Sequence, residues 1–71
     1  MGIKNDIEKF ASDHKIALRD YQKSNLRNIE REYDGGKIDK DGVVNKVAFE
    51  LKKEGRLLSS GEMRELKGKL H

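Results

Sequence analysis

The stretch VVNKVAFELKKEGRLLSSGEMREL, residues 43–66, holds the features that decide the fold. Its first apolar residues recur at helical spacing on one face, at Val43, Val44, Val47, Ala48 and Leu51, with Phe49 on a neighbouring flank. Gly55 follows the last of them, as is typical of a helix C-terminus. The pattern predicts a helix over about residues 43–54, with Asp39 or Asp41 as its N-cap.

A second helix is predicted over about residues 60–69. Ser59 and Glu62 have the spacing of a capping box, in which the hydroxyl and the carboxylate each accept a hydrogen bond from the other residue's backbone N–H. Met63, Leu66 and Leu70 form its inward stripe, and the connector residues Leu57 and Leu58 are expected to fill the core.

Upstream, a stripe of apolar residues at helical spacing extends from Ile3 to Tyr33. Two interpretations stay open: one helix over 3–34, or two helices with a break near residues 12–15, where Ser12 or Asp13 would cap the second. Ile16 lies off the stripe, which favours the break. The pair Gly35-Gly36 is expected to end the helical region. A small hairpin pairing residues 37–38 with 43–44 is the only candidate for strand structure.

The chain of 71 residues has the length of one domain, residues 1–71, and it contains no proline and no cysteine. We therefore predict an all-α fold, a small bundle of three to four helices with a helix-turn-helix-like C-terminal pair. Its expected core is Phe10, Leu18, Ile29, Val47, Leu51, Met63 and Leu66. No stretch reaches the roughly 18 apolar residues of a membrane span, and a cytoplasmic protein is expected.

No pattern indicates an enzyme, a metal site or a cofactor. Asp39, Asp41 and Glu50 match three positions of a calcium loop, but Val43 and Val44 stand where an oxygen ligand and the turn glycine belong. The two histidines, His14 and His71, are far apart in the sequence, and no cysteine supplements them. His14 falls on the apolar stripe and is expected to be partly buried, whereas His71 is expected to be solvated. Without a catalytic or small-molecule signature, the chain is predicted to act by binding a macromolecule.

Two kinds of partner fit the sequence. The first is a protein, or a second copy of the chain, bound through a helix face more apolar and aromatic than a two-sided helix needs: Tyr21, Leu26, Ile29 and Tyr33. The second is nucleic acid. The net charge is +3, and all of the excess lies in residues 36–71. The candidate phosphate contacts there are Lys52, Lys53, Arg56, Arg64 and Lys67 on the C-terminal helical pair.

Overall fold

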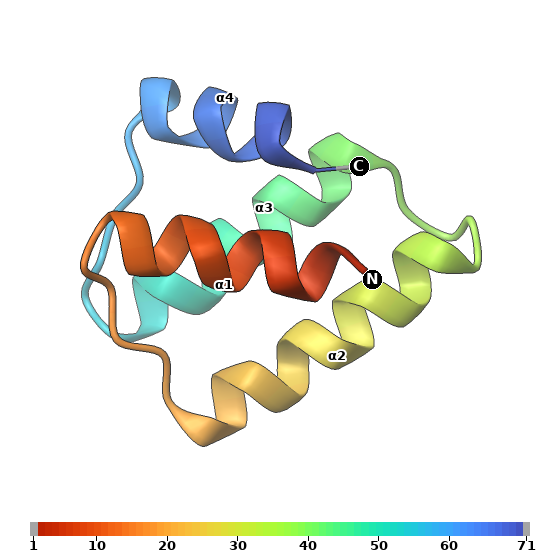
Figure 1. The fold of residues 1–71 in the computed structure, drawn as a ribbon, viewed down its shortest axis with the longest axis horizontal. Helices are drawn as coiled ribbons and strands as arrows, with labels where there is room; N and C mark the ends of the chain where they lie inside the picture. Colours follow the sequence, from red (N-terminus) through yellow and green to blue (C-terminus); the bar gives the residue numbers. More distant parts are fainter. Residues whose placement is uncertain (1, 71) are drawn as a thin grey trace.

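The computed structural model describes residues 2–70, and within them all regular structure is helical (Figure 1). The helices are α1 (Ile3–Asp13), α2 (Asp20–Asp34), α3 (Lys40–Lys53) and α4 (Ser60–Lys69). The predicted all-α bundle is confirmed. His71 lies outside the described residues. No helix in residues 2–70 is long and apolar enough to cross a membrane.

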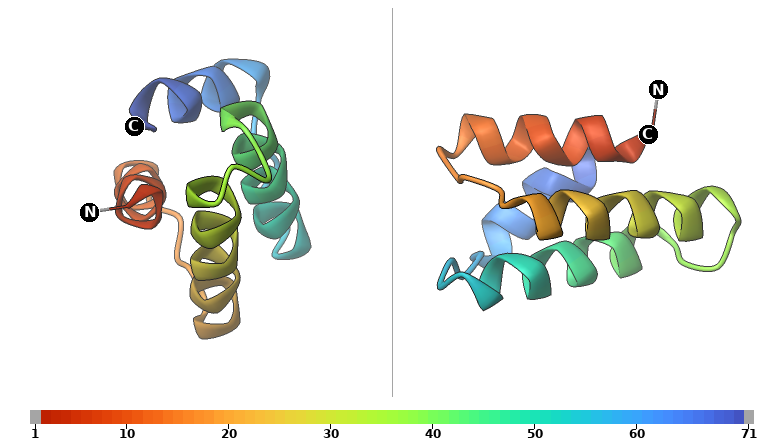
Figure 2. Two further views of the ribbon diagram at one scale, coloured as in Figure 1. Left: turned by 90° about the vertical axis from the view of Figure 1, so that its right-hand side faces the viewer. Right: turned by 90° about the horizontal axis from the view of Figure 1, so that it is seen from below.

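The four helices pack in a closed cycle. Each contacts its neighbours in the chain, and α4 returns to pack against α1. Successive helices run in alternating directions, and the start of α1 lies near the end of α4 (Figures 1 and 2). Every helix therefore has two helical neighbours, and each must present an apolar face wide enough to cover both.

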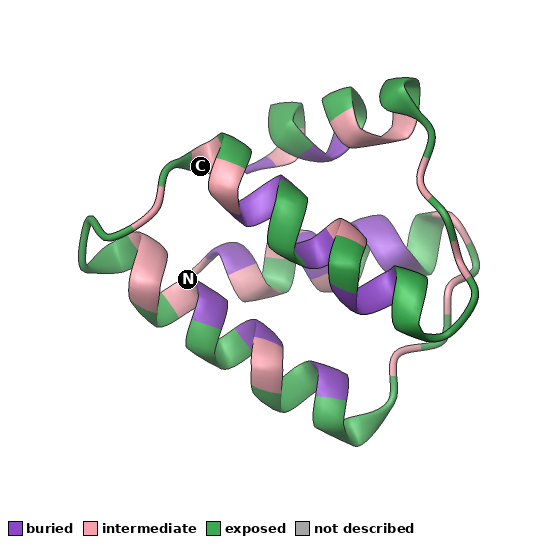
Figure 3. Ribbon diagram, turned by 180° about the vertical axis from the view of Figure 1, so that it is seen from behind, coloured by how far each residue is buried: buried purple, intermediate pink, exposed green. Residues whose placement is uncertain are grey.

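The core lies inside this cycle, where the buried segments of the helices face one another (Figure 3). Five of the seven predicted core residues are buried: Phe10, Ile29, Val47, Leu51 and Leu66. The other two, Leu18 and Met63, are half-buried and pack against the same cluster. The core also takes in Ile3, Ile7, Leu26, Val43, Val44 and Leu70.

The break between α1 and α2 is confirmed, but neither Ser12 nor Asp13 caps the second helix. Both lie in the last turn of α1, and α2 begins only at Asp20. The chain reverses at Lys15, whose φ of 56° is in the left-handed region, and the N–H of Ile16 donates to the carbonyl of Ala11 at 2.7 Å. Ile16 and Leu18 then pack against the core. Burial of these two apolar side chains moves the start of α2 downstream of the predicted position.

Glycines end α2 and α3 as predicted. Gly35 is the C-cap of α2, and the left-handed residue that follows is Gly36, with φ of 78°. Gly55 has φ of 84° directly after the C-cap of α3. An L side chain at either position would be strained. The hairpin is not formed, because Val43 and Val44 belong to α3, which Asp39 caps by accepting from the N–H of Gly42 at 2.8 Å.

The capping box at the start of α4 is also confirmed. Ser59 Oγ accepts from the N–H of Glu62 at 3.2 Å, and Glu62 Oε1 accepts from the N–H of Ser59 at 2.9 Å. In the connector before it, Leu58 packs against the core, but Leu57 is 66% exposed. The expectation that both leucines fill the core is wrong for Leu57, since adjacent residues in an extended connector point in opposite directions.

Ser59→Ala should destabilise the protein by about 1 kcal/mol, because the N–H of Glu62 loses its partner. Urea unfolding followed by circular dichroism measures this difference. The matched control is Ser60→Ala, at an exposed position of the first turn where no cap is lost. Equal effects of the two substitutions would show that Ser59 does not stabilise α4.

Glu62 makes the stability of the folded protein depend on pH. The Arg56 guanidinium donates to its carboxylate at 2.8 Å, and with the Ser59 N–H it lowers the pKa of Glu62 from 4.5 to about 2. A lowered pKa means that the stabilisation is complete above pH of about 4.5 and is lost as the pH falls towards about 2.

The melting temperatures of the wild type and Glu62→Gln, measured from pH 2 to 7, test this expectation. Glutamine keeps the capping box but removes the charge that faces Arg56 and His14. We expect a difference at neutral pH that vanishes near pH 2. A difference independent of pH would rule out a contribution from the carboxylate's charge.

Candidate functional site

Three of the five predicted phosphate-binding cations pair with carboxylates of the same chain. Lys53 contacts Glu50 at 3.0 Å and Lys67 contacts Asp41 at 2.9 Å. Arg56 bonds to Glu62, as described above. The remaining two, Lys52 and Arg64, are exposed, and the structure of residues 2–70 gives their side chains no ion pair.

The five cations also fall into two groups rather than one surface. The contact with Asp41 holds Lys67 near the start of α3, whereas Lys52 lies near its end. At about 1.5 Å per residue, these positions on α3 are about 16 Å apart. Lys53 and Arg56 lie at the same end of α3 as Lys52, and Arg64 lines a separate hollow with Lys67. The five candidate cations of the C-terminal helical pair therefore do not form one basic surface.

The structure also contradicts most of the predicted protein-binding face on α2. Leu26 and Ile29 are 1% and 5% exposed, so they belong to the core and not to a surface. Tyr33 is half-buried against the same core. Only Tyr21 is exposed, and its hydroxyl donates to Glu54 on the neighbouring helix. The apolar face of α2 is wide because it packs against both α1 and α3.

A different surface feature lies between α2 and α3. It is a groove of about 410 Å³, and we call it the α2–α3 groove. It is lined by Asn25, Asn28, Ile29 and Glu32 from α2 and by Asn45, Lys46, Phe49 and Glu50 from α3. The groove therefore follows α2 for about two turns and α3 for about one and a half.

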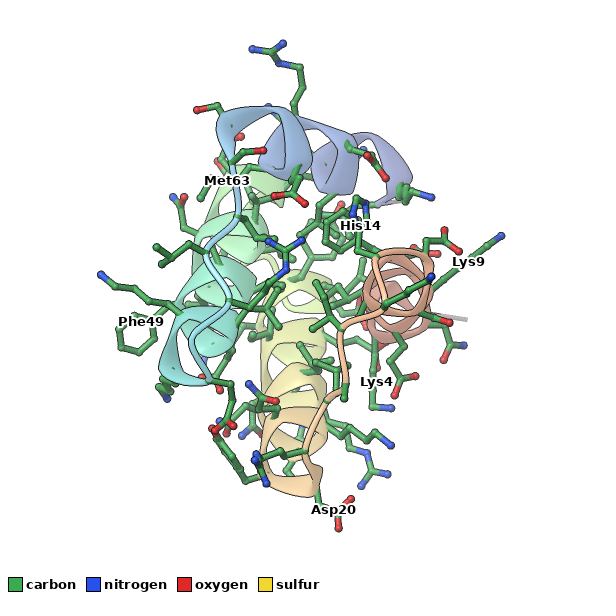
Figure 4. The ribbon with its side chains drawn as sticks, turned by 90° about the vertical axis from the view of Figure 1, so that its left-hand side faces the viewer. Lys4, Lys9, His14, Asp20, Phe49 and Met63 are labelled. Carbon is green, nitrogen blue, oxygen red and sulfur yellow. The ribbon has the colours of Figure 1, made fainter. Side chains whose placement is uncertain are left out.

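Phe49 is the most prominent side chain of this groove. It points away from the bundle on the outer side of α3 (Figure 4), and it is 61% exposed. Lys53, one turn further along α3, places its ammonium 4.9 Å from the centre of the Phe49 ring. The ring therefore has one face next to a cation and presents the rest of its surface to solvent.

Charges inside the α2–α3 groove are neutralised in pairs. Glu32 and Lys46 meet across it at 3.2 Å. Glu50, which is 8% exposed, is contacted by the Lys53 ammonium and accepts from the Asn25 amide at 3.0 Å. The groove wall is thus apolar and amide-rich, with no net charge from these four ionised residues.

Hydrogen bonds between helices hold the walls of the groove in place. Gln22, buried beside it, donates from Nε2 to the Glu50 carbonyl at 2.8 Å. Near the C-terminal end of α3, Glu54 accepts from both Tyr21 and Arg19. These bonds lower the pKa of Glu54, with that of Tyr21 as the larger cause, and raise the pKa of Tyr21 above its usual value. Hydrogen bonds therefore connect α2 with α3 at several points along their length.

His14, a residue type common at catalytic and metal sites, contacts an aromatic ring and two carboxylates of the same chain. Its ring lies 4.4 Å from that of Phe10, and its Nε2 is 2.9 Å from Glu65 while Nδ1 is 3.4 Å from Glu62. It is half-buried as expected and connects the end of α1 with the start of α4 (Figure 4). Within residues 2–70, no group of three or more His, Cys, Asp or Glu residues could hold a metal ion.

Sequence reasoning did not single out the α2–α3 groove. One available signal is Phe49, an aromatic residue off the apolar stripe of its helix. Another is the presence of Asn25, Asn28 and Asn45 in the interiors of two helices, where asparagine has a poor helix propensity. Neither signal indicates that the two sets of residues face the same groove, because that depends on how α2 packs against α3.

Comparison of the chain with protein-family models, with curated proteins and with solved structures finds no match.

Proposed function

We propose that this protein is a non-enzymatic binding module that engages a partner protein through the α2–α3 groove, with Phe49 as the anchor. The observation that carries the proposal is the exposure of Phe49, 61%, beside a groove with an apolar wall. Aromatic residues, phenylalanine among them, are enriched at the centres of protein interfaces, where they act as anchors. The proposal keeps the expected cytoplasmic localisation.

Amide groups around the groove support a protein partner. Asn28 and Asn45 offer donors and acceptors that suit the polar groups of a polypeptide. Protein interfaces commonly combine an apolar centre with a polar rim, and the paired charges of Glu32 and Lys46 fit such a rim. The helices on either side are held by hydrogen bonds, so little order has to be gained on binding.

Nucleic acid, the alternative, has weaker support. Of the five candidate cations, Lys53, Arg56 and Lys67 already interact with carboxylates, and a phosphate would have to compete with those carboxylates. In the groove itself, Glu32 and Glu50 would repel a phosphate backbone. Of these five candidates, only Lys52 and Arg64 are unpaired, and two phosphate contacts are too few for tight binding of nucleic acid.

Site-specific photo-crosslinking tests the proposal. A photoreactive phenylalanine is placed at position 49 or, as the control, at position 57, where Leu57 is similarly exposed but does not line the groove. A protein captured from position 49 but not from position 57 is identified, purified and titrated with the wild type, Phe49→Ala and Leu57→Ala. We expect Phe49→Ala to weaken binding by at least about 10-fold, the loss typical of a hot-spot residue.

Leu57→Ala should leave that affinity within about 2-fold, because a rim or remote residue contributes little. Both variants should fold normally, since surface substitutions usually change stability by less than about 0.5 kcal/mol. Equal affinities of the wild type and Phe49→Ala would contradict the proposal. Titration with duplex and single-stranded DNA at low salt completes the test, and binding tighter than about 10⁻⁴ M that Lys52→Ala with Arg64→Ala abolishes would favour nucleic acid.

A further inference from the structure

The distribution of unpaired charge around the α2–α3 groove narrows the chemistry of the partner. We propose that the groove binds an amphipathic helix of another protein, with an apolar side chain inserted between α2 and α3 and carboxylates on its flanks. This inference rests on the proposed function, because it concerns the same groove and names its occupant.

The shape of the groove fits a helix. Its lining on α2 extends from Asn25 to Glu32, about 10 Å at 1.5 Å per residue, which corresponds to two turns of a partner helix. The groove is bounded by two antiparallel helices, and an amphipathic helix laid along such a groove inserts residues spaced by three and four. The Phe49 ring, which is 61% exposed, supplies the main apolar contact for these residues. A volume of about 410 Å³ accepts side chains rather than a whole element.

The charge around the groove favours a partner helix with acidic residues on either side of its apolar face. Inside it, each carboxylate has a cation, as described above. On its margins, Arg31 follows Asn28 by one turn of α2, and Lys52 follows Phe49 by one turn of α3. Both are exposed, and within residues 2–70 their side chains have no ion pair. Asp20 and Asp34 are the first and last residues of α2, beyond the ends of the groove lining. Glu30, the other α2 carboxylate without an ion pair in the described residues, is turned towards α1, where it accepts from the Lys4 N–H.

The same charges disfavour two other occupants. A second copy docked groove to groove would bring two cationic margins, each with Arg31 and Lys52, towards each other, and like charges are repulsive. A single-stranded nucleic acid would need to stack a base on Phe49, and the Lys53 ammonium already covers one face of that ring. The carboxylates of Glu32 and Glu50 would also lie beneath its phosphates.

Selection from a displayed library of random helical peptides tests the inference with the full chain as the target. We expect the enriched peptides to carry apolar residues spaced by three or four on one face and a net negative charge. A synthetic peptide of the most enriched sequence should bind at least about 10-fold more weakly to Phe49→Ala than to the wild type. Sedimentation equilibrium of the free protein should show a monomer.

Charge reversal provides the matched comparison. Arg31→Glu with Lys52→Glu should weaken the peptide by at least about 10-fold. The control pair, Lys9→Glu with Lys23→Glu, changes the net charge by the same amount at two exposed residues, and it should have less than about a 3-fold effect. Lys9 lies on the opposite side of the molecule from Phe49 (Figure 4), and Lys23 lines a hollow towards α1.

Several results would overturn the inference: enriched peptides that are neutral or basic, equal effects of the two charge-reversed pairs, or a dimer that Phe49→Ala dissociates. Peptides that depend on Phe49 but lack acidic flanks would overturn the inference alone and leave the proposed function in place. No enrichment, or peptides that bind Phe49→Ala as well as the wild type, would count against both.

Discussion

Leu51→Ala is expected to destabilise the protein by about 2–5 kcal/mol, the usual cost of deleting a buried leucine side chain. Leu51 is 2% exposed and lies in the central cluster, on the third of four helices that enclose it. A domain of this size has about 5 kcal/mol of stability to lose, so a substantial fraction of the variant should be unfolded at ordinary temperatures. Urea unfolding followed by circular dichroism measures the effect.

Leu57→Ala is the matched control, because it makes the same chemical change at a leucine that is 66% exposed. Its effect should be below about 0.5 kcal/mol. The contrast between the two leucines isolates burial as the cause. A loss of less than about 1 kcal/mol for Leu51→Ala would mean that α3 is rotated relative to the core described here.

Gln22→Met should cost about 2–4 kcal/mol although methionine has nearly the same length. Gln22 is 1% exposed, and its amide serves two helices: Oε1 accepts from the Arg19 N–H at the start of α2, and Nε2 donates to the Glu50 carbonyl. That carbonyl depends on Gln22, because the N–H of Glu54 donates to Leu51 instead. A buried carbonyl left without a partner costs about 1–3 kcal/mol, and the lost bond at the helix start adds about 1.

Lys23→Met controls for the introduction of methionine into α2, because Lys23 is the exposed next residue and makes no interhelical bond in the described structure. Its free energy of unfolding should stay within about 0.5 kcal/mol of the wild type. If Gln22→Met proves as stable as Lys23→Met, the buried amide bonds are replaceable by apolar packing at no cost. Gln22→Met should also weaken binding in the α2–α3 groove, since Glu50 forms part of its wall.

Local sequence signals predicted the ends of three helices. Ser59 with Glu62, Asp39, Gly36 and Gly55 all act through hydrogen bonds or backbone conformations within a few residues of themselves. Such interactions are present in the chain before any tertiary contact forms, so they can be inferred without knowledge of the packing. The start of α2 was not predicted correctly, because it depends on the packing of Ile16 and Leu18 against residues that are distant in the sequence.

The candidate site was less predictable. Leu26 and Ile29 were expected on a surface because the apolar face of α2 is wide, and the structure buries them because α2 has neighbours on two sides. Lys67 was expected to be free, and it pairs with Asp41, 26 residues away in the sequence. Periodicity gives the direction of a side chain about its own helix, but it does not give what lies opposite.

The sequence by itself thus determined an all-α bundle, the positions of most helix ends, and most of the apolar side chains that form the core, since these follow from backbone conformation and from the period of the α-helix. Only the tertiary structure decided which cations are paired and that Asn25, Asn28 and Phe49 line one groove. Both depend on the register and rotation of α2 against α3. Those are set by the simultaneous packing of all four helices around one core, which is a property of the assembled fold and of no single segment.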